Sequence, residues 1–203
     1  MIDRTDQLNH KQQAFVVSDQ CVACGICVGS CPSSTPFRRI EDIVSGIELP
    51  GTPVVALRKQ LQQELAALTG PAKIMLFTCK QAADWRTLAD PSTAVLPLEC
   101  AGMLPPSFIE YALRLGADGV VIAGCREGDC EFRLADRWVQ GRLTGVREPR
   151  LRAAAPRERI AVVWSGNQRA QVIQAMASLR STLQELSSTT DSQTIDLSDE
   201  QLH

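Results

Sequence analysis

Four closely spaced cysteines near the start of the chain constrain it more than any other feature. The stretch CVACGICVGSCP, residues 21–32, places them at positions 21, 24, 27 and 31 and follows the last with a proline. The spacing C-x2-C-x2-C lets one tight loop supply three thiolates to an iron-sulfur cubane, and Gly25 gives that loop room to turn. A structural zinc site is the alternative, but such sites usually combine two separated pairs of ligands. The stretch therefore predicts a [4Fe-4S] cluster.

The full string C-x2-C-x2-C-x3-C-P resembles the cluster-binding motif of bacterial ferredoxins, and the strand-like run FVVSDQ before it also fits that family. In two-cluster ferredoxins the last cysteine of the run ligates the other cluster, whereas this chain holds one copy of the motif. We therefore expect Cys21, Cys24 and Cys27 to be ligands. Cys31 is favoured as the fourth ligand, and a remote cysteine or a residue of a partner chain is the alternative.

The eight cysteines also bear on the compartment. The beginning of the chain is polar where a secretory signal would be apolar, and no apolar stretch approaches the length of a membrane span, so we expect a cytoplasmic protein. In a reducing compartment, thiols are more often metal ligands or redox groups than disulfides. A net charge of −2 argues against a general nucleic-acid binder, which needs cationic side chains for the phosphates.

Short apolar runs alternate with helical patterns after residue 73, which predicts parallel strands joined by crossover helices. The strand candidates are 74–77, 94–98, 120–123 and 160–164, and Pro97 favours an edge position for the second. Helices are expected over 54–68, over 105–115 before Gly116, and where apolar residues recur at Val172, Ala175, Met176, Leu179, Leu183 and Leu186. The pattern predicts an α/β fold, a flavodoxin-like open parallel sheet of about four strands with helices, preceded by a small ferredoxin-like cluster-binding segment.

The expected division of the chain follows from these patterns. Residues 1–52 are the ferredoxin-like segment, which prolines break up and which is too short for a core of its own. Residues 53–70 are a connecting helix with leucines along one face. Residues 71–187 form the sheet domain, and the polar, acidic residues 188–203 are expected to be a flexible tail.

The other four cysteines become a set once the strands are considered. Cys79, Cys100 and Cys125 close three successive strand candidates, and Cys130 follows in the next loop. The carboxyl ends of parallel strands share one edge of a sheet, where ligands bind in open α/β folds. Single cysteines that end apolar strands are commonly small buried hydrophobes, but three such cysteines and a fourth nearby indicate a site.

The segments FTC and CAGMLPPSFIEYALRLGADGVVIAGCREGDC, followed by a strand and an amphipathic helix, resemble the delta subunit of methyl-viologen-reducing hydrogenase. That family consists of iron-sulfur electron-transfer proteins associated with heterodisulfide reductases, and the resemblance spans residues 72–187. It implies a [2Fe-2S] cluster carried by Cys79, Cys100, Cys125 and Cys130. The spacing by itself does not distinguish [2Fe-2S] from a cubane.

These features predict an electron-transfer iron-sulfur subunit of a multi-subunit oxidoreductase of the heterodisulfide reductase or hydrogenase type. The chain has no substrate motif, and its two histidines, His10 and His203, lie near its ends, so we expect no catalytic residue of its own. Its expected partners are other subunits of a redox complex, a flavoprotein or an iron-sulfur subunit. An iron-sulfur redox sensor or regulator and a zinc-stabilised interaction module are the alternatives.

A stretch rich in arginine follows the second set of cysteines. Residues 133–159 hold eight arginines, which form either a solvated helix face and connector or a docking face for an acidic partner subunit. On either interpretation we expect these side chains to be exposed, including Arg142, Arg147, Arg150 and Arg152.

Overall fold

A parallel sheet of four strands forms the centre of the structure, a computed structural model that describes residues 14–37 and 45–199, the last eleven as backbone. The strands are β1 (Ile74–Cys79), β2 (Thr93–Leu98), β3 (Gly119–Gly124) and β4 (Ile160–Trp164). The helices are α1 (Ile26–Gly29), α2 (Val54–Ala66), α3 (Pro106–Arg114), α4 (Ala135–Thr144) and α5 (Arg169–Asp199), with 3-10 turns η2 (Arg86–Leu88), η3 (Ala101–Met103) and η4 (Arg157–Arg159). The predicted α/β class and all four predicted strands are confirmed.

The order of the strands is β2-β1-β3-β4, with every neighbouring pair parallel. β1 and β3 are central and buried along their whole length, while β4 at one edge is half-buried. Pro97 lies on β2 at the other edge, where the missing N–H of proline costs no ladder hydrogen bond. The edge position predicted from Pro97 is confirmed.

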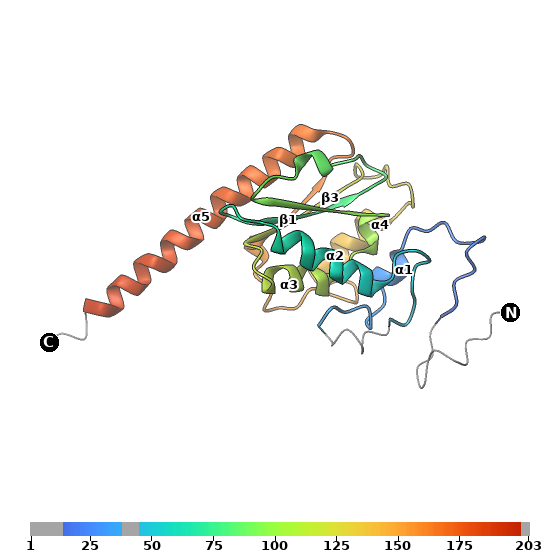
Figure 1. The fold of residues 1–203 in the computed structure, drawn as a ribbon, viewed down its shortest axis with the longest axis horizontal. Helices are drawn as coiled ribbons and strands as arrows, with labels where there is room; N and C mark the ends of the chain where they lie inside the picture. The colour runs from blue at the N-terminus through green and yellow to red at the C-terminus, as the bar shows by residue number, and fades with distance from the viewer. Residues whose placement is uncertain (1–13, 38–44, 200–203) are drawn as a thin grey trace.

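Side chains alternate between the two faces of the sheet and build two apolar layers. On one face Met75, Phe77 and Ile122 pack with the leucines of α2 and with α3 and α4. On the other face Leu76 and Val121 pack against α5, through Val172, Met176 and Leu179, and against Trp85 and Leu88 around η2. Figure 1 shows the sheet between α5 on one side and α2 and α3 on the other.

The segment before α2 contributes to this same core. Val28 of α1 and Leu49 are buried in the layer that contains α2 and the sheet. Among the described residues, the strand-like run at residues 14–17 forms one bridge, between Ala14 and Ile47, and Phe15 is 56% exposed. The core is thus continuous from the first cysteine loop to the sheet. The predicted segment 1–52 lies in part, and His10 and His203 lie wholly, outside the described residues.

Helix α5 is longer than the apolar pattern predicts. It runs to Asp199, into the polar stretch for which a loose tail is expected, and Figure 1 shows it projecting beyond the sheet. Its buried face ends near Leu179, since Leu183 is half-buried and Leu186 is already 37% exposed. No helix in the described ranges is both long and apolar enough to cross a membrane.

Candidate metal centres

Three cysteines meet at the carboxyl edge of the sheet. Cys79 is the last residue of β1, Cys125 directly follows β3, and Cys100 is the second residue after β2. All three are buried, and the Sγ atoms of Cys79 and Cys125 lie 3.8 Å apart. Parallel strand order produces this convergence, because β1 lies between β2 and β3 and all three strands end at the same edge.

Cys130 lies on the same side of the sheet edge as Cys100. Both sulfur-bearing side chains contact a small apolar cluster built on Ile26 and Ala135, to which Phe132 and Trp138 also contribute. Cys24, from the first cysteine loop, packs against this cluster too. The structure thus brings a member of each cysteine set to one apolar cluster, which the sequence did not predict.

The three buried thiols differ in how readily they ionise. Hydrogen bonds from the thiols of Cys100 and Cys125 lower the pKa of Cys79 far below its ordinary value. The same interaction with Cys79, together with burial, raises the pKa of Cys100 and of Cys125. One negative charge is therefore readily held on Cys79, whereas a second and a third thiolate need a cation to compensate them.

Two buried hydroxyl groups near this edge have no hydrogen-bond partner within the part of the chain that the structure describes. Thr78 precedes Cys79, and Ser165 directly follows β4 at the same end of the sheet as the cysteines. Ser165 is 2% exposed and lines a cavity of about 320 Å³ together with Cys125 and Arg126. A buried hydroxyl without a partner is costly, so Ser165 fits a site in which an acceptor belongs.

The first cysteine loop lies against η3, and Gly25 of the loop is close to Met103 of that turn. Gly25 has a left-handed backbone, with φ of +71°, and a Cβ atom there would lie 2.6 Å from Cγ of Met103. The loop then enters the one-turn helix α1, whose Ile26 and Val28 are buried. Glycine is thus required at position 25 by both conformation and space, and the loop is pressed onto the turn that follows Cys100.

The cysteines of this loop are more accessible than those at the sheet edge. Cys27 is exposed, while Cys21, Cys24 and Cys31 are half-buried, and the backbone N–H of Ala23 donates to Sγ of Cys21 over 3.4 Å. Their side chains therefore lie at a surface, around a loop anchored by the apolar residues of α1.

Cys31 differs from its neighbours in its environment. Its Sγ lies 3.1 Å from the hydroxyl of Ser33. Burial raises its pKa, but hydrogen bonds from Ser33, Ser34 and Gly46 outweigh that effect and lower the pKa to about 7. Burial instead raises the pKa of Cys27. Cys31 consequently ionises more readily than Cys27 near neutral pH, a property that suits a ligand.

The fit of these thiols to a metal group can be judged from their arrangement. Within residues 14–37 and 45–188, no three cysteine, histidine or acidic side chains are grouped so as to hold a single metal ion. An iron-sulfur cluster contains several irons, so its thiolates surround a larger core and need not converge on one point. Both donor sets consist of thiols alone, and the three buried thiols at the sheet edge lie next to apolar side chains, which matches soft iron-sulfur chemistry.

The arginine-rich stretch is not one solvated face. The expectation that Arg142 is exposed is wrong, because this side chain is 1% exposed and bonds to the backbone oxygen of Gly102. Arg157 and Arg159 also donate to backbone oxygens of the chain. A docking face remains a prediction for the other arginines of the stretch, which are exposed: Arg133, Arg137, Arg147, Arg150 and Arg152.

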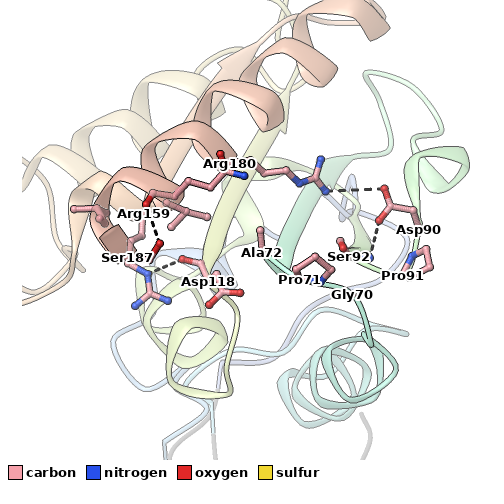
Figure 2. Close-up of a pocket in the computed structure, with 13 residues that line it drawn as sticks. Gly70, Pro71, Ala72, Asp90, Pro91, Ser92, Asp118, Arg159, Arg180 and Ser187 are labelled. Atoms are coloured by element: carbon pink, nitrogen blue, oxygen red, sulfur yellow. Dashed lines mark hydrogen bonds and ion pairs between the residues drawn. The ribbon is translucent and has the colours of Figure 1, made fainter. Parts of the chain in front are cut away.

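A separate cavity of about 900 Å³ lies at the opposite, amino-terminal edge of the sheet, and no sequence pattern indicated it. Figure 2 shows Arg180 reaching toward Asp90, and Arg159 toward Asp118. Arg180 Nη2 lies 4.0 Å from Asp90 Oδ2, and Arg159 donates to the backbone oxygen of Asp118. Both cations are thus engaged within the chain, and the lining contains no thiol.

Comparison with known proteins decides the family. A family model described as the delta subunit of methyl-viologen-reducing hydrogenase matches residues 74–187, more than half of the chain. The chain belongs to this family. The matched region of this delta-subunit family member begins at β1 and ends in α5, so it contains Cys79, Cys100, Cys125 and Cys130 but not the first cysteine loop.

Two curated relatives agree with this assignment. The chain is 30% identical to an iron-sulfur subunit of the F420-non-reducing hydrogenase of Archaeoglobus profundus over 97 residues, 47% of this chain and 71% of the relative. It is 34% identical to an iron-sulfur subunit of the F420-non-reducing hydrogenase vhc of Methanococcus voltae over 74 residues, 36% of this chain and 51% of the relative. Both relatives are named as iron-sulfur subunits of hydrogenases, and each match covers less than half of this chain.

Proposed function

We propose that this delta-subunit family member is an electron-transfer subunit with two iron-sulfur centres. Cys21, Cys24, Cys27 and Cys31 would hold a [4Fe-4S] cluster, and Cys79, Cys100, Cys125 and Cys130 a [2Fe-2S] cluster. The first residues, to about 52, would be the ferredoxin-like part, with α2 joining it to the sheet domain. Iron-sulfur clusters, when bound, accept and release single electrons, which is the chemistry this function requires.

One observation carries the proposal: Cys24 from the first set packs on the same small apolar cluster as Cys100 and Cys130 from the second. Two centres at these positions would be neighbours, as a relay needs. The cysteines would supply the thiolates, the apolar side chains of Ile26 and Trp138 would limit the access of water, and backbone N–H groups would donate hydrogen bonds to sulfur. The N–H of Gly102, for example, donates to Sγ of Cys100 over 3.4 Å.

The partners are proposed from the relatives. Electrons would enter from a reduced subunit and leave to an oxidised subunit of a cytoplasmic oxidoreductase complex of the hydrogenase or heterodisulfide reductase type, either of them a flavoprotein or another iron-sulfur protein. The exposure of Cys27 and of Val22, which is 71% exposed, leaves the first loop open to such a subunit. Anaerobic pull-down from the source cells, with identification of the captured subunits, tests this part.

The cluster content is tested by chemical analysis of anaerobically purified protein. We expect about six irons and about six acid-labile sulfides per chain, four of each in the first centre and two in the second. Electron paramagnetic resonance of the reduced protein should show two distinct signals. A preparation that reproducibly contains zinc and no sulfide would show that the cysteines form zinc sites and that the proposal is wrong.

A further inference from the structure

A buried arginine lies between the two cysteine-bearing segments. Arg142, on the last turn of α4, is 1% exposed and is among the largest fully buried side chains of the described residues. Its Nη1 donates to the backbone oxygen of Gly102 over 2.9 Å, and its Nη2 donates to Oγ of Ser30 over 2.7 Å. The two arms of one guanidinium therefore hold the turn after Cys100 and the loop before Cys31.

The charge of this arginine is not balanced by a carboxylate. Among the described residues, no acidic side chain forms an ion pair with Arg142, and its buried Nε has no hydrogen-bond partner. Burial lowers the pKa of Arg142 to about 10, and the nearby charge of Arg147 adds to that effect. Hydrogen bonds link the guanidinium to Cys100 through one residue: Arg142 donates to the backbone oxygen of Gly102, and the N–H of Gly102 donates to Sγ of Cys100 over 3.4 Å.

Burying a cation without a compensating charge raises the free energy of the folded chain, because the cation loses its hydration. Only an opposite charge and hydrogen bonds within the protein can offset this loss. Arg142 makes two hydrogen bonds, both to neutral oxygens, and one of these oxygens belongs to Gly102, which also bonds to the sulfur of Cys100. A cluster with anionic thiolate ligands at Cys100 would attract the guanidinium and lower the cost of burying it. The same attraction favours any further negative charge that arrives at the group that Cys100 holds.

We propose that Arg142 is a positioning residue that fixes the two cysteine segments against each other and places a buried positive charge beside Cys100. This inference rests on the proposed function, since the charge acts on a cluster ligated by Cys100. Its consequence is that the centre at the sheet edge is easier to reduce than it would be without the guanidinium, because reduction adds a negative charge beside a fixed cation.

The test compares three variants of the full chain, purified without oxygen: Arg142→Gln, which removes the charge, Arg142→Lys, which keeps the charge but not the planar fork, and Arg147→Gln as a control. Arg147 is a neighbouring arginine, but it is exposed and stacks over Trp138, with the guanidinium carbon 4.9 Å from the ring centre. Its charge is partly screened by solvent, so its removal should affect the sheet-edge centre less than removal of the buried charge of Arg142.

Iron and sulfide are measured first, and then the midpoint potential of each centre by a spectroscopically monitored redox titration. In Arg142→Gln with full iron content, the equilibrium constant for one-electron reduction of the sheet-edge centre should fall about tenfold, a shift of about 59 mV to lower potential. Arg142→Lys should stay within about threefold of the wild type, as should Arg147→Gln. An unchanged potential in fully loaded Arg142→Gln overturns the charge role.

Unfolding of the metal-free chain by denaturant provides a readout that does not depend on a cluster. Both Arg142→Gln and Arg142→Lys should unfold at lower denaturant than the wild type, and Arg147→Gln should not, because only the fork of Arg142 joins Gly102 to Ser30. Equal midpoints for all variants overturn the positioning role. If Arg142→Gln does not take up iron, a fully loaded Arg142→Lys with a wild-type potential supports the charge role, and one with a tenfold loss overturns it.

Wild-type protein without iron or sulfide would overturn the proposed function and the charge role together. The unfolding comparison would still decide the positioning role, so the two failures can be told apart.

Discussion

Gly29 lies so close to Gly102 that a Cβ atom at position 29 would stand 2.2 Å from the Gly102 backbone oxygen. This contact presses the end of α1 onto η3, the turn that begins directly after Cys100. The first cysteine loop therefore packs directly against the edge of the sheet. Two independent domains joined by a linker would not make such a close backbone contact. The position of one cysteine set depends on the backbone of the other.

Replacing Gly29 by alanine should destabilise the metal-free chain by about 1–3 kcal/mol, because the added methyl group collides with backbone that cannot move aside easily. The measurement is chemical denaturation followed by circular dichroism. Gly141→Ala is the matched control: this glycine is inside α4, a Cβ there would lie 3.2 Å from Cβ of Arg147, and alanine is favoured in helices. Equal unfolding midpoints for the two variants would contradict the close packing.

Single cysteine substitutions should remove one centre each. Cys125→Ala takes a ligand from the sheet-edge set, so we expect about four irons to remain, and Cys24→Ala should leave about two. Cys24 packs on the same group of apolar side chains as Cys100. Each variant should therefore also shift the paramagnetic resonance signal of the iron-sulfur centre that remains. Iron analysis and paramagnetic resonance measure both effects, and the loss of all iron from a folded variant would argue against two sites.

The lowered pKa of Cys31 predicts a pH-dependent reactivity in the metal-free, reduced protein. Above pH 7 more than half of Cys31 should be thiolate, whereas Cys27, whose pKa is raised by burial, should remain mostly protonated near neutral pH. At pH 7.5 iodoacetamide should thus modify Cys31 before the more exposed Cys27, as followed by peptide mass spectrometry.

The hydroxyl of Ser33 is a main cause of that shift, since it bonds to the sulfur of Cys31. Ser33→Ala should therefore move the midpoint of the Cys31 reaction to higher pH and slow it at pH 7.5. The rate at Cys27 is the internal control and should not change. A Cys31 rate that is lower than that of Cys27 at pH 7.5 in the wild type would refute the assignment.

Ser165→Ala should have different effects on the metal-free protein and on the protein loaded with clusters. In the metal-free chain the variant loses a buried hydroxyl that has no partner, so its unfolding free energy should be unchanged or raised by up to about 1 kcal/mol. In the loaded chain the variant should lose a hydrogen-bond donor near Cys125 and lower the potential of that centre. Ser178→Ala, at an exposed position on α5, is the control. A potential equal to the wild type would exclude Ser165 as a donor.

The sequence by itself determined the four strands of the sheet, the edge position of one of them and the location of the second cysteine set. Apolar runs that end in cysteine predict strands whose cysteines lie at one edge of the sheet, because parallel strands place their carboxyl ends together. Pro97 predicts an edge position for its strand, because proline cannot donate a hydrogen bond to a second neighbouring strand. The tight turn at Gly25 was also predicted from the sequence, and the left-handed backbone of this residue agrees with that prediction.

Only the tertiary structure decided what lies between the two cysteine sets. No local pattern indicates that Gly29 meets Gly102, that Cys24 shares an apolar cluster with Cys100, or that Arg142 is buried while Arg147 is exposed. Periodicity reports which face of an element is apolar, but the burial of a charged side chain depends on oxygens brought from distant segments. Ser30 is 112 residues from Arg142 in the chain, and packing alone makes them neighbours.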